Sequence, residues 1–139
     1  MKRFSAAVSL LLGLLALTGC AGSESRLDIL LEDPMANPTL SFAEPSRHRE
    51  FEGNSSTIIG SADAAEVSTA FDLTLEHFET AEQELLGQAE QAGYILEEVG
   101  SNERDLGSIL YQGSRRTPEG SSILLRLLFV PGGVQVRLM

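Results

Sequence analysis

Apolar residues recur at intervals of three and four over residues 75–92, which is the most regular pattern in the chain. On an α-helix these positions fall on one side: Leu75, Phe78, Ala81, Leu85, Leu86, Ala89 and Ala92. Thr74 stands at the expected N-cap, and Gly93 stands where the chain has to leave the helix in a left-handed conformation. The pattern therefore predicts one amphipathic helix, in which Gly87 costs about 1 kcal/mol relative to alanine.

Apolar and polar residues alternate before and after this helix, which is typical of strands with one buried face. The stretches after the helix are separated by short Gly-rich segments, and such loops between consecutive strands indicate an antiparallel meander. The expected strands are residues 47–52, 66–73, 94–99, 108–112, 122–130 and 134–138. A helix with one apolar side packs on a sheet with one apolar face, so the predicted fold class is a two-layer α+β domain whose antiparallel sheet has about four to six strands.

The strand over residues 122–130 departs from this alternation, because both of its faces are largely apolar. One face carries Ile123, Leu125, Leu127 and Phe129, and the other carries Leu124, Arg126, Leu128 and Val130. A central strand covered on both sides explains the pattern if the proline-rich segment before the first strand lies on the second face. An exposed apolar patch around Leu124 and Leu128 that binds a partner is the alternative. The sequence leaves both interpretations open.

The segment before the first strand is expected to form an irregular strap, residues 27–45, that lies against the domain. Leu27, Leu30 and Leu31 fall at helical spacing, so residues 26–32 should form a helical turn that ends before Pro34. Residues 33–38 contain two prolines and are not expected to hold regular structure.

The N-terminus has a different organisation, with a short basic start, an apolar run over residues 4–17, and then Leu17-Thr18-Gly19-Cys20. This order is typical of a secretory signal peptide. The apolar run of 14 residues is short for a membrane-spanning helix, which needs roughly 20.

Leu17-Thr18-Gly19-Cys20 resembles the lipobox of bacterial lipoproteins. The resemblance implies that a peptidase cuts between Gly19 and Cys20 and that the Cys20 thiol carries a diacylglycerol, which holds the chain at a membrane surface outside the cytoplasm. Two acyl chains anchor a protein stably, at roughly 0.8 kcal/mol per buried methylene. Ala21 in place of aspartate resembles outer-membrane sorting if the host has two membranes.

The resemblance divides the chain into a signal peptide, residues 1–19, a lipidated cysteine with a flexible tether, residues 20–26, and a single domain, residues 27–139. The order of lipobox, Asp33-Pro34-Met35-Ala36, Gly/Ser-rich turn, helix and meander is also similar to small, largely uncharacterised actinobacterial lipoproteins.

Removal of residues 1–19 makes the chain more acidic. The precursor has a formal net charge of −10, and its only lysine leaves with the signal peptide. Eight arginines then face 20 acidic residues, a net charge of −12. Such a charge disfavours binding of nucleic acid and is expected to hold the domain off anionic lipid by the length of the tether.

The sequence contains no recognisable catalytic or metal-binding motif. Cys20 is the only cysteine. Neither His48 nor His77 has another metal-ligating residue near it in the sequence at a spacing typical of metal sites. Glu97 and Glu98 are neighbours on an expected strand, so they point to opposite faces and do not form a catalytic pair. We therefore expect no metal, no cofactor and no catalytic residue.

Arg115-Arg116 is the only pair of adjacent basic residues in the mature chain. We expect it in a solvated loop, residues 113–120, although it could instead bind an anionic partner or the acidic helix of its own fold. With Leu124 and Leu128 it forms the candidate contact set for a protein partner in the envelope. The sequence leaves the oligomeric state open.

The predicted function is that of a membrane-anchored lipoprotein whose domain is a non-enzymatic interaction or accessory module. Binding of a small ligand or a cation is the alternative, and a small hydrolase is a further one.

Overall fold

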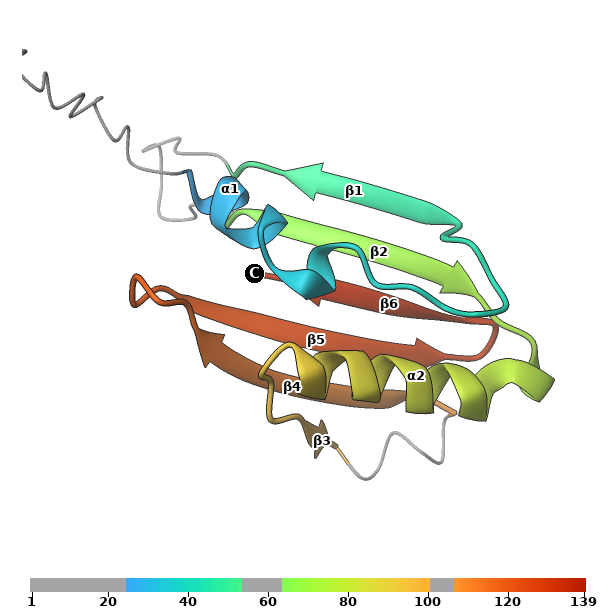
Figure 1. Ribbon diagram of the computed structural model, residues 1–139. Helices are drawn as coiled ribbons and strands as arrows, with labels where there is room; N and C mark the ends of the chain where they lie inside the picture. The colour runs from blue at the N-terminus through green and yellow to red at the C-terminus, as the bar shows by residue number, and fades with distance from the viewer. Residues whose placement is uncertain (1–24, 54–63, 101–106) are drawn as a thin grey trace, which may run out of the picture.

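A six-stranded antiparallel sheet with helices on one face forms the fold of the protein. The computed structural model describes residues 25–53, 64–100 and 107–139 (Figure 1). The strands are β1 (Arg47–Phe51), β2 (Glu66–Asp72), β3 (Glu97–Val99), β4 (Ile109–Arg116), β5 (Ser122–Val130) and β6 (Gly133–Leu138). Their order in the sheet is β1-β2-β6-β5-β4-β3. The predicted α+β class, with one amphipathic helix on an antiparallel sheet, is confirmed.

The C-terminal strands β3 to β6 form the predicted meander, in which each strand pairs with the next along the chain. The β1–β2 hairpin joins this meander through β6, which pairs with β2 on its other side. β6 and β5 therefore lie at the centre of the sheet, while β1 and β3 form its edges.

The main helix begins three residues later than the sequence predicted. α2 spans Phe78–Gln91, and a short 3-10 turn, η2 (Leu75–His77), precedes it. Leu75 was expected on the buried side, but it lies before the first α-helical turn and is 92% exposed. The side of α2 that packs on the sheet carries Ala81, Leu85 and Ala89. Gly93 has a φ of 94°, so its left-handed conformation is confirmed.

The N-terminal strap is more regular than predicted. The expected helical turn is present as α1 (Arg26–Leu31), and a 3-10 turn, η1 (Pro34–Ala36), follows it. Ser25 and Asp28 form a reciprocal capping box at the start of α1. Ser25 and Arg26, the last residues of the predicted tether, therefore belong to this helix and its cap.

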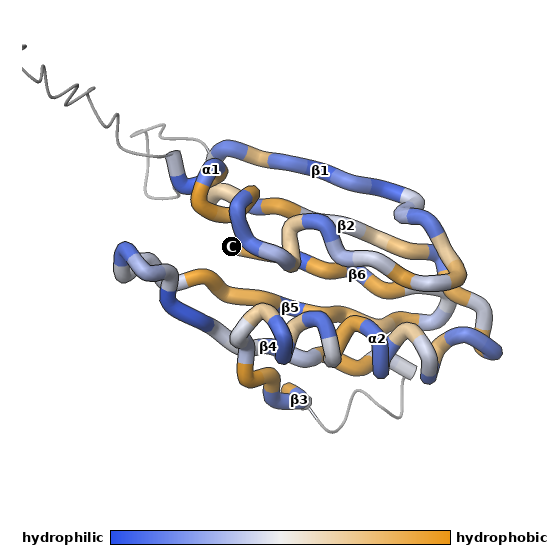
Figure 2. Tube along the Cα trace, in the orientation of Figure 1, coloured by the Kyte–Doolittle hydropathy of each residue, from blue (hydrophilic) through white to orange (hydrophobic). Residues whose placement is uncertain are grey.

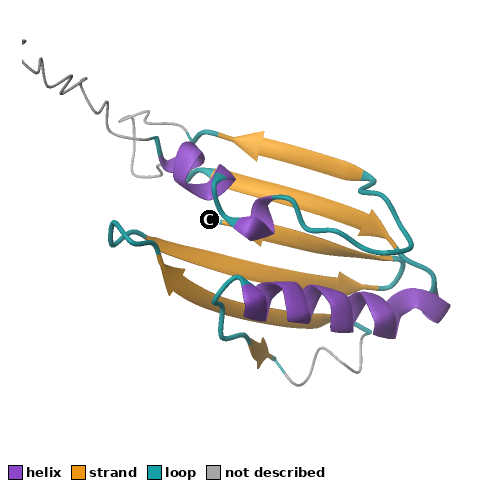
Figure 3. Cartoon of the chain, viewed as in Figure 1, coloured by secondary structure: helices purple, strands orange, loops and turns teal. Residues whose placement is uncertain are grey.

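The strap and α2 lie side by side on the same face of the sheet (Figures 1 and 3). The two are joined by hydrogen bonds, from the Thr39 amide to Oε1 of Gln88 at 2.9 Å and from the Ser41 amide to Oε2 of Glu84 at 2.9 Å. The bonds from Ser41 lower the pKa of Glu84. The interpretation that the strap covers the second face of β5 is therefore wrong.

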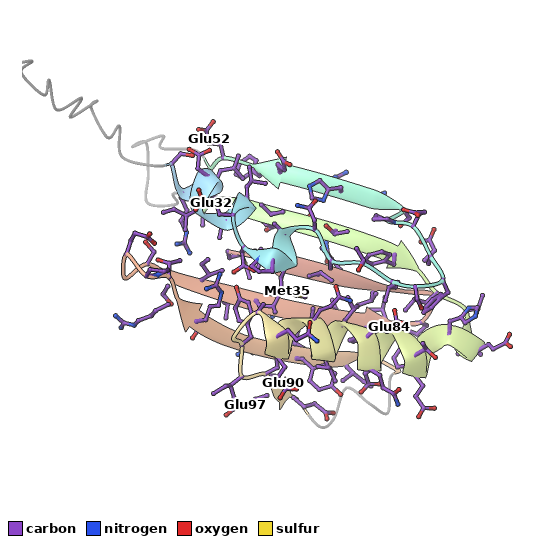
Figure 4. The ribbon with its side chains drawn as sticks, viewed as in Figure 1. Glu32, Met35, Glu52, Glu84, Glu90 and Glu97 are labelled. Carbon is purple, nitrogen blue, oxygen red and sulfur yellow. The ribbon has the colours of Figure 1, made fainter. Side chains whose placement is uncertain are left out.

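The core fills the space between this helical layer and the sheet. Leu30 and Met35 of the strap are buried there with residues of α2, and in Figure 4 Met35 lies on the strap segment in front of the central strands. Figure 2 shows the central strands as the most hydrophobic part of the sheet and β1 as hydrophilic. Phe129 on β5 contacts the rings of Phe78 and Tyr111 edge to face.

Two strand boundaries differ from the prediction around Gly113. β3 begins at Glu97 instead of residue 94, and β4 continues past Gln112 to Arg116. At Gly113 a Cβ atom would lie 2.2 Å from the carbonyl oxygen of Ile95. The glycine that was interpreted as the start of a loop thus lets the segment before β3 approach the middle of β4.

Candidate functional site

No described segment covers the second face of the sheet, which we call the open face. From Ile123 onward the residues of β5 alternate between buried and half-buried, and Leu124 and Leu128 are half-buried. Side chains of paired residues in antiparallel strands lie on the same face. The pairings therefore define which residues of each strand lie on the open face. From β3 across the sheet to β1 they are Glu97, Val99, Leu110, Gln112, Ser114, Arg116, Leu124, Arg126, Leu128, Val130, Gln135, Arg137, Glu66, Ser68, Ala70, Asp72, Arg47, Arg49 and Phe51.

The strand register gathers arginines on this face. Arg126 pairs directly with Arg137, Arg137 pairs with Ser68, and Ser68 pairs with Arg49. Three arginines thus lie in one row across four strands, although like charges opposite each other destabilise a sheet. Arg47 lies beside Ala70, one row away.

A concave groove with a volume of about 730 Å³ lies on the open face over β1, β2 and β6. Arg47, Arg49 and Arg137 line it together with Glu66 and other side chains. Arg137 binds Glu66 through two of its three nitrogens, with Nε–Oε1 at 3.1 Å and Nη2–Oε2 at 2.5 Å. Arg47 and Arg49 are exposed and make no ion pair with a described residue. As far as the described residues go, the groove therefore offers two guanidinium groups without a salt bridge.

Arg126 lies between Leu124 and Leu128 and is half-buried. Its Nε atom is buried and has no hydrogen-bond partner in the described part of the chain. A buried donor without an acceptor is costly and is rare in folded proteins. An anionic group bound at this face would supply the missing acceptor.

The acidic residues gather on the other side of the molecule. Residues 25–46 and 73–93, which contain the strap and α2, hold nine carboxylates and one arginine. Glu32, Glu84 and Glu90 belong to this helical layer (Figure 4). Arg26, its arginine, donates to the carbonyl oxygens of Ser122 and Met139 at 2.5 and 2.8 Å. The open face has five arginines against three carboxylates. The two sides thus have opposite charge.

The predicted pair Arg115-Arg116 is divided between the two sides of the sheet. Both residues belong to β4, so the expected solvated loop is wrong at these positions. Nε and Nη2 of Arg115 lie 2.8 and 2.5 Å from Oδ2 of Asp33, whose side chain is fully buried. Arg116 is exposed on the open face. Arg115 therefore holds the strap, and Arg116 is the member that a partner can reach.

Tyr94 completes this buried contact. Its hydroxyl donates to Oδ2 of Asp33 at 2.8 Å, and the guanidinium of Arg115 lies 5.5 Å from its ring centre. Burial and the bond to Asp33 together raise the pKa of Tyr94, although Arg115 lowers it in part. Asp33 also accepts a bond from the Met35 amide at 2.8 Å. The three side chains join the strap, the end of α2 and β4.

His48 contacts a hydroxyl and a carboxylate. Its Nδ1 lies 2.8 Å from Oγ1 of Thr69, and its Nε2 lies 3.3 Å from Oε1 of Glu50. A hydrolase would need this hydroxyl to reach a substrate, but Thr69 is only 2% exposed. His77 stacks on Phe42. In the described ranges no three His, Cys, Asp or Glu residues form a group that could hold a metal ion.

An apolar pocket of about 280 Å³ lies at the end of the sheet where α2 begins. Leu75, Phe78, Ile109 and Pro131 are among the residues that line it. The size is close to the lower limit for ligand pockets, which are usually about 300–1,000 Å³.

Gly19 and Cys20 lie outside the described residues, so the lipid anchor stays a prediction. No described helix is long and apolar enough to cross a membrane.

Sequence reasoning missed the arginines of the open face. The available signals were the alternate spacing of Arg47 and Arg49 and the position of Arg126 on the second face of its strand. Whether these positions meet depends on strand order, which the local pattern does not contain. No protein-family model, curated protein or solved structure matches the chain.

Proposed function

We propose that the protein is a lipid-anchored, non-enzymatic interaction domain of the bacterial cell envelope, and that the open face of its sheet is the surface it presents to a partner. The observation that carries this proposal is the open face itself, on which half-buried leucines flank Arg126, whose buried Nε atom has no hydrogen-bond partner among the described residues. Exposed surfaces with this mixture typically mark interaction sites.

The lipobox supports the anchoring part of the proposal. Cys20 and the N-cap residue Ser25 are separated by four residues, so a lipid on Cys20 would hold the folded domain close to a membrane. Two acyl chains on one cysteine suffice for stable attachment.

Replacement of Cys20 tests the anchor. In a bacterial host that processes lipoproteins, the wild-type chain should incorporate labelled palmitate and sediment with membranes. Cys20→Ala should accumulate as unlabelled precursor. Equal labelling of the two chains would contradict anchoring at this residue.

Site-specific photocrosslinking tests the interaction surface. A photoreactive residue in place of Leu128, on the open face, should form adducts in cells, whereas the same residue in place of Glu79, exposed on α2, should not. Adducts from Glu79 alone would contradict the assignment of the open face.

The apolar pocket beside α2 favours a second candidate function, binding of a small apolar ligand. A thermal-shift screen with fatty acids and other apolar solutes should then raise the unfolding temperature of the wild-type chain. Leu75→Ser should reduce that shift, because Leu75 lines the pocket and is otherwise exposed. No shift with any solute would exclude this candidate.

A further inference from the structure

We infer that the partner of the open face is the anionic surface of the membrane to which the chain is anchored. This inference rests on the proposed function, because it needs the lipid on Cys20 to bring the domain to the membrane. It reverses the expectation from net charge, which is that the domain stays off anionic lipid.

The distribution of charge gives the domain a preferred orientation at such a surface. Five arginines face outward from the open side of the sheet, against three carboxylates. The helical layer on the opposite side has nine carboxylates and one arginine. Near an anionic bilayer the helical layer is repelled and the open face is attracted, so the domain turns its open face toward the lipid.

The arginines of the open face are available to phosphate groups. Arg47 and Arg49 line the groove without an ion pair to a described residue, and the Nε atom of Arg126 lacks an acceptor. A guanidinium binds phosphate through two parallel N–H donors, which makes arginine well suited to phosphodiester headgroups.

Apolar side chains accompany these arginines on the same face. Leu124 and Leu128 flank Arg126, and Leu110 pairs with Leu128 from the next strand. Phe51 is 47% exposed at the edge of the sheet. A surface that has both arginines and aliphatic groups can contact the phosphates and the boundary of the acyl chains together, as interfacial proteins do.

The tether is long enough for the open face to reach the bilayer while the anchor is inserted. Ser25 follows Cys20 by five residues, and a fully extended chain reaches at most about 17 Å over that length. Packed layers are about 10 Å apart, so this reach allows the chain to pass the end of the sheet. Arg26 fixes α1 to Ser122 and Met139, at the same end of the sheet as Leu124. The open face can therefore lie on the bilayer while the anchor stays inserted.

The same charges argue against a second copy of the chain as the occupant. Two open faces packed together would bring arginine rows against each other, and like charges repel strongly where water is excluded. An acidic segment of another protein fits the charge as well as a bilayer does, but nothing in the chain holds it nearby. The short tether gives the membrane a high effective concentration at this face.

The lipidated mature protein, reconstituted into vesicles, tests the inference. Because Cys20 carries lipid, a single introduced cysteine is the only free thiol and accepts a fluorescent label. Ser114→Cys places the label on the open face, and Glu79→Cys places it on the helical layer, both at exposed positions. Vesicles of phosphatidylcholine with or without phosphatidylglycerol contain brominated lipid, which quenches a label close to the bilayer.

The Ser114 label should be quenched on anionic vesicles and recover in 0.5 M salt, while the Glu79 label should not be quenched in either case. Arg47→Gln with Arg49→Gln should lower the ratio of docked to undocked domains by about 30-fold, from the typical contribution of a basic residue at an anionic surface. Arg47→Lys with Arg49→Lys should retain docking, and it shows that loss in the glutamine variant does not come from misfolding.

Equal quenching of the two labels on anionic vesicles would overturn the inference while leaving the anchor intact. If neither label is quenched on anionic vesicles and Leu128 crosslinks to an acidic protein in cells, the partner of the open face is that protein and not the membrane. Mass spectrometry of the purified chain separates these outcomes from failure of the proposed function, because an unmodified Cys20 would overturn both.

Discussion

Substitution of Arg115 or Arg116 by glutamine should have very different effects on stability. The two arginines are adjacent in sequence, but Arg115 binds the buried carboxylate of Asp33, and Arg116 is exposed on the opposite side of the sheet. Each substitution removes one positive charge and shortens the side chain by the same amount. Their difference therefore measures the buried contact alone.

The magnitude follows from the surroundings of Asp33. Its side chain is fully buried and its Oδ2 accepts both bonds from Arg115, whose own side chain is 20% exposed. Removal of one partner of a buried ion pair typically costs about 3–5 kcal/mol, since a buried charge is left unneutralised. We expect about 3 kcal/mol for Arg115→Gln, because Tyr94 and the Met35 amide still donate to the carboxylate. Arg116→Gln should change stability by less than about 0.5 kcal/mol.

Urea unfolding of residues 20–139 with Cys20→Ser measures this difference. With a slope of about 1.5 kcal/mol per molar urea, Arg115→Gln should lower the midpoint by about 2 M, and Arg116→Gln should leave it nearly unchanged. A double-mutant cycle that adds Asp33→Asn to Arg115→Gln isolates the coupling between the two side chains. Equal midpoints for the two arginine variants would refute the view that Arg115 holds the strap.

Other predictions concern pH and the glycines. Because burial and Asp33 raise the pKa of Tyr94, the folded chain holds the phenol proton more tightly than the unfolded chain. Stability should therefore be independent of this group below about pH 10 and fall above it by up to about 1.4 kcal/mol per pH unit, and Tyr94→Phe should flatten that slope in urea unfolding between pH 9 and 11. Gly87→Ala should raise the free energy of unfolding by about 0.5–1 kcal/mol, since the new methyl group would meet no atom within 4 Å apart from its chain neighbours and the backbone of its own helix. Gly93→Ala should lower it by about 1 kcal/mol in the same assay, because its φ is 94°. Of the three glycine variants, Gly113→Ala should lower the thermal unfolding temperature the most, since its Cβ would meet a backbone oxygen at 2.2 Å.

The parts of the fold that could be predicted are those with a local period. The spacing of Ala81, Leu85 and Ala89 indicates a helix without knowledge of the rest of the chain, and the alternation in the last two strands indicates a hairpin. The side on which the strap packs could not be predicted, because apolar residues such as Leu30 and Met35 fit either face of β5. It is decided by contacts that are distant in sequence, above all the bonds that Asp33 accepts from Tyr94 and Arg115.

The candidate site depends even more on pairings between residues that are far apart in the sequence. Arg126 and Arg137 are separated in the sequence by a turn, but the register places them opposite each other. Arg49 joins their row only because β6 inserts between β5 and β2. Leu124 and Leu128 were predicted from sequence as partner contacts, since an apolar second face is visible locally. Arg115 was predicted for the same role, but the structure places it against Asp33.

Net charge and charge distribution answer different questions about this domain. The net charge of −12 that is predicted after removal of residues 1–19 acts at long range and opposes approach to an anionic surface. At physiological salt, however, charges are screened over about 8 Å, so at contact only the side chains that face the surface count. The open face has a surplus of arginine there, while nine carboxylates lie across the sheet in the helical layer. Salt should therefore act in two opposite ways on the anchored domain, weakening the repulsion that delays contact and weakening the contact itself. Docking that strengthens steadily with salt would mean that repulsion is the larger effect, and the arginine row would then have no electrostatic role at the membrane.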